Sequence, residues 1–223
     1  MLNVRVGPCR YLAALLVMAA SCTGGGGGTP SPSASVRATR PPTTESPPAE
    51  IPSPFVRTCE SAVYGQLAPN WMTRSVVVGP LAFAGLKNAA RERARDFQRR
   101  PGGYDAVKEL VVIRTGSTAT VSIPRFEWKY VAFLYDPAAS PSGNRGRWWL
   151  ISDGERAVTF RACRQGESPY GSGPTQYNGG FIVDGPRCVA LDVRIGDQMP
   201  KRVVVSFGTG SPVCPLELER HQT

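Results

Sequence analysis

Histidine is nearly missing from this chain, which has a single one, His221, among 223 residues. It lies next to the C-terminus, where chain ends are often poorly ordered. Ser-His-Asp and Cys-His catalysis both need a histidine held in a rigid site, and many zinc sites need several. The scarcity of histidine argues against these classes of enzyme and metal site.

Other catalytic signatures are missing as well. There is no G-x-S-x-G, no S-x-x-K and no Asp-rich calcium loop, and Gly208-Thr209-Gly210-Ser211 lacks the lysine of a P-loop. We therefore expect no catalytic residue, no metal and no cofactor. One enzymatic alternative stays open, because a glycosidase needs only two suitably spaced carboxyls. Glu127, Asp136 and Glu155 lie near the ends of expected strands.

The chain also lacks an apolar run long enough to span a membrane, which takes about 20 residues. Its longest run, Tyr11–Ala20, follows Arg5 and Arg10 and precedes small residues. A charged head, a short apolar core and small residues are typical of an export signal. We assign residues 1–21 to a signal peptide.

Ala19-Ala20-Ser21-Cys22 resembles the end of a bacterial lipoprotein signal. The resemblance implies cleavage before Cys22, lipidation of its sulfur, and a protein anchored at the extracytoplasmic face of the cell membrane. Ala19 departs from the family, which usually has leucine there. Ala19-x-Ser21 also suits an ordinary signal peptidase, so a secreted protein is the alternative.

Residues 22–54 contain five consecutive glycines followed by a stretch rich in Pro, Ser and Thr. Such a segment has too few large apolar side chains to fold alone. We expect a tether that could extend on the order of 100 Å.

The remaining segment, 55–223, suits one domain with a sizeable core. The chain carries a net charge of +9, and only four of its basic residues are lysines. For a basic domain outside the cell we expect the membrane, an envelope glycan or a membrane protein as partner, rather than nucleic acid.

Short β-strands separated by turn residues fill this domain. Gly79-Pro80 and Asp153-Gly154 favour hairpins, and Lys129–Tyr135 is apolar on both faces, as expected of a central strand. About nine or ten strands predict an all-β fold, an Ig-like sandwich or a closed barrel. The expected strands are Arg74–Val78, Leu81–Ala84, Leu110–Arg114, Thr118–Ile123, Lys129–Tyr135, Arg147–Ser152, Glu155–Cys163, Phe181–Val183, Cys188–Ile195 and Arg202–Phe207.

Four cysteines remain in the domain, and an even number in an exported protein implies two disulfides. Cys163 and Cys188 each lie on the strand face opposite the apolar row. This matching phase favours Cys163–Cys188, which leaves Cys59–Cys214.

One stretch, Leu86–Arg100, lacks β-branched residues and has Ala90, Ala94 and Phe97 at helical spacing. It predicts a short amphipathic helix. Arg91, Arg95 and Arg99 are its candidate anion-binding face, and a solvated helix face is the alternative.

Aromatic residues supply the candidate binding surface. Trp148 and Trp149 are adjacent, so one is expected in the core and the other exposed, and Tyr170 and Tyr177 lie in the long Gly-rich loop Gly166–Gly180. Exposed aromatics bind sugars and protein partners, and long loops are often functional. Ordinary packing is the alternative reading.

The segment G-G-F-I-V-D-G-P-R-C, Gly179–Cys188, resembles actinobacterial secreted or lipoprotein β-domains of unassigned function. A Gly-Pro-Leu-x-Phe segment at Gly79–Phe83 and cysteines near both ends of the domain agree with that layout. The resemblance implies an exported β-domain and no activity. We expect a non-catalytic binding or accessory module of the envelope, with an envelope glycan hydrolase as the alternative.

Overall fold

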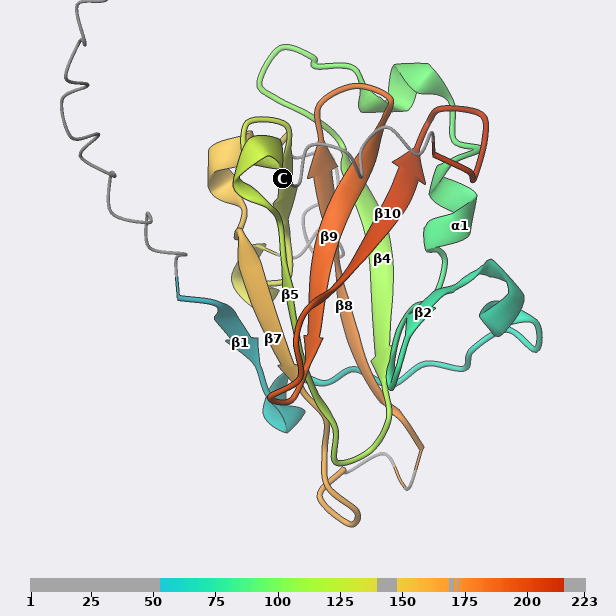
Figure 1. Cartoon of the computed structure of the whole chain (residues 1–223), viewed down its shortest axis with the longest axis vertical. Helices are drawn as coiled ribbons and strands as arrows, with labels where there is room; N and C mark the ends of the chain where they lie inside the picture. The colour runs from blue at the N-terminus through green and yellow to red at the C-terminus, as the bar shows by residue number, and fades with distance from the viewer. Residues whose placement is uncertain (1–52, 140–147, 169–170, 172, 215–223) are drawn as a thin grey trace, which may run out of the picture. The chain divides into compact units, whose positions relative to one another are not determined.

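The computed structural model describes residues 53–139, 148–168, 171 and 173–214. The expected signal peptide and residues 22–52, with Cys22, lie outside this part. The described residues form ten strands in two five-stranded sheets (Figure 1). The all-β sandwich and the two disulfides predicted from the sequence are confirmed. No helix among these residues has the length and apolar character needed to cross a membrane.

The strands are β1 Phe55–Arg57, β2 Val76–Val78, β3 Leu81–Phe83, β4 Ala106–Ile113, β5 Thr118–Ser122, β6 Val131–Phe133, β7 Ala157–Arg161, β8 Thr175–Val183, β9 Arg187–Ile195 and β10 Lys201–Phe207. The helices are the α-helix α1 Leu86–Ala89 and the short 3-10 helices η1 Cys59–Ser61, η2 Trp71–Arg74, η3 Ala94–Phe97, η4 Arg125–Glu127, η5 Pro137–Ala139 and η6 Ile151–Asp153.

Sheet A has the strand order β1-β7-β5-β9-β10, and sheet B the order β2-β3-β4-β8-β6. Every pairing is antiparallel except that of β1 with β7. The predicted hairpin at Gly79-Pro80 is confirmed by the Val78–Leu81 pair of β2 and β3.

β8 replaces the second half of the loop expected at Gly166–Gly180. Gly179 and Gly180 lie in this strand, where a Cβ would collide with the Tyr135 ring and with the Val107 carbonyl. Glycine is required here for close packing, so a composition typical of a loop belongs to a buried strand.

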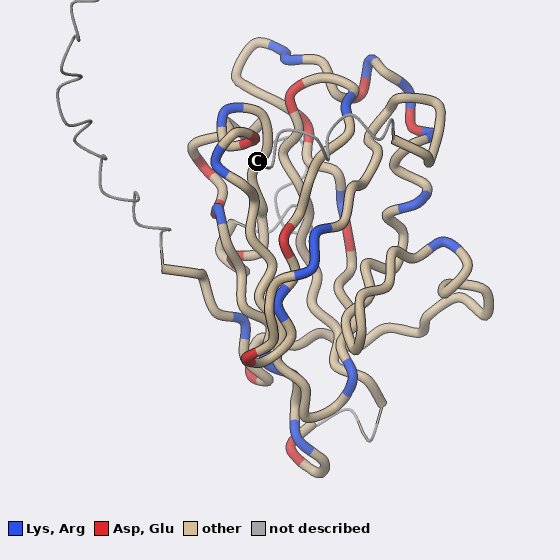
Figure 2. Tube along the Cα trace, viewed as in Figure 1, with Lys and Arg blue, Asp and Glu red and all other residues tan. Residues whose placement is uncertain are grey.

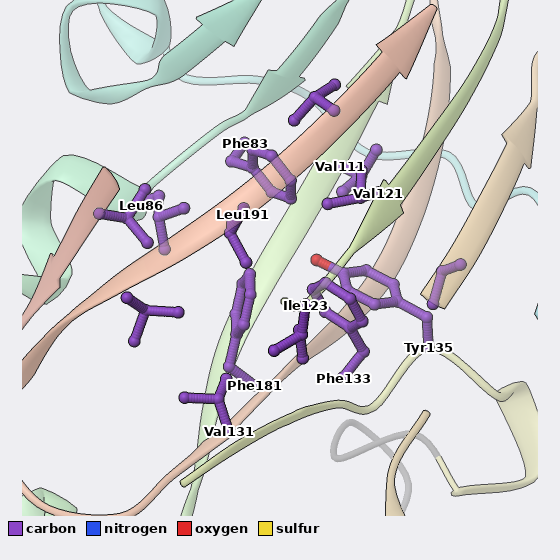
Figure 3. Packing of buried hydrophobic residues seen from close by; sticks show 14 of the residues in the cluster. Phe83, Leu86, Val111, Val121, Ile123, Val131, Phe133, Tyr135, Phe181 and Leu191 are labelled. Carbon is purple, nitrogen blue, oxygen red and sulfur yellow. The ribbon is translucent and has the colours of Figure 1, made fainter. Parts of the chain in front are cut away.

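The core lies between the two sheets (Figure 3). Alternate residues of each strand face inward, as the period of a β-strand requires. Phe181 of β8 lies 5.4 Å from Phe133 and 5.3 Å from Phe207 between ring centroids, and Tyr135 lies 5.0 Å from Phe160. The contacts of Phe181 with Phe207 and of Tyr135 with Phe160 join sheet B to sheet A, whereas the Phe181–Phe133 contact lies within sheet B.

A second apolar cluster covers part of the outer face of sheet B. It contains Tyr104, Ala132, Leu134, Trp149 and Ile182. The cluster explains why β6 is buried on both faces although it is an edge strand, not the central strand that we predicted.

Arg57 ties β1 to sheet B. It is 1% exposed, and its guanidinium donates hydrogen bonds to the carbonyls of Tyr135 (2.6 Å) and Asn178 (3.0 Å). It also donates to the carbonyl of Ser61 (2.6 Å) and to its hydroxyl (2.9 Å). Burial lowers the pKa of Arg57, and these four hydrogen bonds compensate the buried charge.

The disulfides join Cys59 to Cys163 and Cys188 to Cys214, so the predicted pairs Cys163–Cys188 and Cys59–Cys214 are wrong. β5 lies between β7 and β9, so these strands are not neighbours. Cys163 follows the end of β7, whereas Cys188 is near the start of β9, at the other end of the sheet. Strand phase gives the face on which a residue lies, but not which strands are adjacent.

The expected helix over Leu86–Arg100 is interrupted. α1 ends at Ala89, and η3 follows at Ala94–Phe97. The backbone N–H groups of Gly208 and Gly210 donate to the carbonyls of Ala89 and Ala90, each at 2.8 Å. These are carbonyls that a longer helix would use internally.

No hairpin forms at Asp153-Gly154. Asp153 belongs to η6, and its carboxylate accepts a hydrogen bond from the Leu150 N–H at 2.8 Å. The aspartate therefore stabilises a helical turn, a role that the same dipeptide also suits.

Candidate functional site

A pocket opens where β3 leaves β4. β3 ends at Phe83, and the Ala84 N–H makes a last bond to the Leu110 carbonyl before the chain turns into α1. On the other side, residues 66–71 cross sheet B, held by a hydrogen bond from the Gln176 side-chain amide to the Gly65 carbonyl at 2.9 Å. The space between these segments is a pocket of about 410 Å³.

A proline turn positions Trp71 at this pocket. The Trp71 N–H donates to the Ala68 carbonyl at 2.9 Å across Pro69-Asn70. This is a β-turn with proline at its second position, where the fixed φ of proline is favourable. Trp71 is half-buried and lines the pocket together with Gln66, Asn88 and Asn178.

Glu109 is the buried acid of the pocket. It occupies the core-facing row of β4 between Val107 and Val111 and is 6% exposed. Its Oε1 accepts a hydrogen bond from the Gly85 N–H at 2.9 Å. Burial raises the pKa of Glu109 to about 7. The carboxyl can therefore exchange a proton near neutral pH.

Two more residues, Arg74 and Tyr135, have a buried polar atom without a hydrogen-bond partner in the described part of the chain. The Arg74 Nη2 lies 3.3 Å from the Asn70 Oδ1, but its Nε is buried without a hydrogen-bond partner among the described residues. The hydroxyl of Tyr135 is likewise buried without a partner in this part of the chain. Burial raises the pKa of Tyr135 well above its usual value, with a further contribution from Glu109. Arg74 lines the pocket, whereas Tyr135 points into the core (Figure 3).

The pocket thus combines a tryptophan, several side-chain amides, a guanidinium and a buried carboxyl. Ligand sites typically combine an apolar wall with a few polar groups that fix orientation. An aromatic wall with planar donors and acceptors suits a sugar or a similar polar ring.

A larger hollow of about 900 Å³ lies beside Cys59. Its charged lining residues, Glu60, Arg161, Arg164 and Glu167, are exposed. Arg164 and Glu167 face each other at 3.9 Å. We favour the smaller pocket because a buried titratable residue, Glu109, is among the residues that line it.

The four aromatic residues predicted from the sequence do not form one surface. Trp149 and Tyr177 are buried, at 1% and 0% exposure. Trp148, which was expected to be exposed, is half-buried, with the Arg100 Cζ 5.2 Å from its ring centroid. Tyr170 lies outside the described residues.

The predicted anion face is not assembled as expected. Arg91, Arg95 and Arg99 are exposed, but they lie on the interrupted segment and do not share one helical face. Arg95 lies 3.9 Å from Asp96, which also pairs with Arg93 at 3.1 Å.

The carboxylates of the enzymatic alternative bond to the backbone. Glu127 is buried and accepts from the Ala190 N–H at 3.4 Å, beyond the point where β5 stops pairing with β9. Glu155 accepts from the Tyr135 N–H at 3.4 Å, and Asp136 from the Ala138 N–H at 2.9 Å. Burial raises the pKa of Glu127 and of Glu155. In all three contacts the carboxylate accepts a hydrogen bond from a backbone N–H, which is a structural role.

Sequence reasoning missed Glu109. Its signal was a single acidic residue in a row that otherwise reads Val107, Val111 and Ile113. A charge at a core-facing position is costly unless it has a partner or a function. The alternation of β4 could have identified it, but our expected strand began at Leu110.

Comparison of the chain with protein-family models, with curated proteins and with solved structures finds no match. Among the described residues, no three His, Cys, Asp or Glu side chains are grouped so that they could hold a metal ion.

Proposed function

We propose that this protein is a lipid-anchored, extracytoplasmic binding module that recognises an envelope glycan without cleaving it. The observation that carries the proposal is the pocket lined by Trp71, side-chain amides, Arg74 and the buried residue Glu109. The export signal and tether expected from the sequence agree with this location.

The chemistry of the pocket favours a neutral polar ring as ligand. A tryptophan face can stack on a sugar ring, and the amides of Gln66 and Asn88 offer both donors and acceptors. Arg74 also lines the pocket, and its guanidinium carries further N–H groups that suit a ligand oxygen. Each such bond contributes about 1 kcal/mol.

The test is co-sedimentation of the chain from Thr23 onward with purified cell-wall sacculi. The whole core and both disulfides lie within residues 53–214, so this chain retains the folded domain. We expect binding that persists at about 0.5 M salt, where attraction between exposed charges is strongly screened.

Two half-buried tryptophans provide matched variants. Trp71→Ala should weaken binding to sacculi at least about tenfold, whereas Trp148→Ala should leave it unchanged, because Trp148 lies outside the pocket. Circular dichroism of both variants controls for folding. Equal binding by Trp71→Ala and the wild type would refute the pocket as the glycan site.

The same experiment distinguishes a binding module from the alternative, an envelope glycan hydrolase. If soluble fragments are released from the sacculi, and Glu109→Gln binds but releases none, the protein is an enzyme and the non-catalytic proposal fails. A buried carboxyl with a pKa of about 7 is suitable for acid-base catalysis, which makes this outcome worth measuring.

A further inference from the structure

A second surface, remote from the pocket in sequence, combines basic and aromatic side chains. It is formed by the segment after β5 together with residues of β9 and β10, and we call it the 125–130 patch. Its members are Arg125, Phe126, Lys129, Tyr130, Arg187 and Arg202.

The buried side of this segment fixes it on sheet A. The Glu127 carboxylate accepts from the Ala190 N–H of β9, and the Trp128 indole N–H donates to the Ile123 carbonyl at 2.7 Å. The Asp184 N–H donates to the Tyr130 carbonyl at 2.8 Å. The remaining side chains are therefore presented by a rigid backbone.

Cations lie against the aromatic rings of the patch. The Arg187 Cζ is 3.8 Å from the Tyr130 ring centroid, and the Lys129 Nζ is 4.6 Å from it. A guanidinium this close must stack on the ring, so its N–H groups point sideways, where they suit a phosphate oxygen.

The positive charge is only partly neutralised. Asp192 pairs with Arg202 at 2.7 Å. Arg125, Lys129 and Arg187 form no ion pair with any residue in the described part of the chain. Figure 2 shows basic residues along the first part of β10 and on the loops at the upper end of the view.

Apolar side chains are exposed beside these cations. Phe126 is 48% exposed, with the Arg202 Cζ 5.8 Å from its ring centroid. Val213 is 77% exposed and precedes Cys214, whose disulfide partner follows Arg187. An anionic polymer would leave these apolar groups in water, whereas a bilayer interface would bury them.

We propose that the 125–130 patch docks the domain on a membrane rich in anionic phospholipids. Basic residues attract the phosphate groups, and Phe126 enters the interfacial region. This inference does not depend on the glycan pocket. Its role would be to orient a domain that the tether alone would leave free to rotate.

The test is binding of the chain from Thr23 onward, without the lipid, to phosphatidylcholine vesicles with and without about 30% phosphatidylglycerol. Arg125→Glu/Lys129→Glu should weaken binding to the anionic vesicles by about thirtyfold or more, because each basic residue contributes about 1 kcal/mol. The wild type should not bind neutral vesicles measurably.

The matched control is Arg114→Glu/Arg161→Glu, which makes the same change in net charge. Both arginines are exposed: Arg114 precedes β5, and Arg161 at the end of β7 pairs with Thr118 at the start of β5, whereas the patch follows the end of β5. This control should retain most of the binding. If both double variants lose binding equally, only net charge matters, and the proposed docking surface is wrong.

Phe126→Ser separates a bilayer from a soluble phosphate polymer. We expect about fivefold weaker binding to vesicles, from the loss of a partly buried ring at the interface. If the charge reversal weakens binding but Phe126→Ser does not, the patch recognises phosphate without inserting, and the assignment to a membrane is overturned.

Discussion

Arg57 and Glu109 are both buried charged residues of this domain, but their surroundings differ. Arg57 donates four hydrogen bonds to backbone and hydroxyl oxygens within the sandwich. Glu109 accepts from the Gly85 N–H and also lines a pocket. A buried charge whose bonding capacity is used by the protein stabilises the fold, whereas one that lines a pocket is available to a ligand.

Removal of a disulfide should give the largest loss of stability, and the disulfide near Arg57 tests how much the β1 region contributes to the fold. Cys59 lies two residues after Arg57, and its disulfide with Cys163 closes a loop with a sequence separation of 104 residues. Loop-closure entropy predicts a loss of about 5 kcal/mol for Cys59→Ser/Cys163→Ser. Urea denaturation measures the free energy of unfolding.

The control is Cys188→Ser/Cys214→Ser, whose separation is 26 residues. It should cost between about 3 and 4 kcal/mol on the same reasoning. A larger loss for this second disulfide than for the first would mean that the β1 region contributes less to stability than its contacts indicate.

Arg57→Leu tests the buried guanidinium whose hydrogen bonds are all made within the protein. It would leave the carbonyls of Tyr135, Asn178 and Ser61 without their donor inside the sandwich. Each unsatisfied buried carbonyl costs about 1–3 kcal/mol, so we expect a loss of about 4 kcal/mol in thermal or urea unfolding. Arg161→Leu, at an exposed site on the neighbouring strand β7, should change stability by less than about 0.5 kcal/mol. A loss of under about 1 kcal/mol for Arg57→Leu would show that water replaces the guanidinium and would remove the contrast with Glu109.

Glu109→Gln tests the buried carboxyl, through the pH dependence of the free energy of unfolding. Burial raises the pKa of Glu109 from 4.5 to about 7, so the folded state retains a proton that the unfolded chain releases. Stability is therefore lost as pH rises from about 4.5 to about 7, by up to about 3 kcal/mol. The glutamine variant cannot ionise and should keep this stability.

We expect Glu109→Gln to match the wild type near about pH 4 and to exceed it by about 3 kcal/mol near about pH 8, in urea titrations at both values. Glu60→Gln, at an exposed position, should show no such difference. Parallel pH dependence of the wild type and Glu109→Gln would mean that the carboxyl is solvated, and Glu109 would no longer differ from a surface acid.

The sequence predicted the fold better than the site, for identifiable reasons. The apolar rows of β7, β9 and β10 alternate, so their inward faces could be read directly, and Val158, Leu191 and Val205 all lie in the core. Glu109 was missed because the expected strand began at Leu110, whereas β4 begins at Ala106. Tyr177 was misplaced because Gly179 and Gly180 favour a loop, although close packing requires them in β8.

By itself the sequence determined the β class, an approximate number of strands, the inward faces of β7, β9 and β10 and the presence of two disulfides, because alternation and cysteine count are local properties. Tertiary structure alone decided that β5 separates β7 from β9, and hence which cysteines pair. It also brought η2, α1 and β4 together at the pocket that Glu109 lines. Such contacts depend on which strands are neighbours in each sheet. The strand order is set by the packing of the whole core rather than by any one segment.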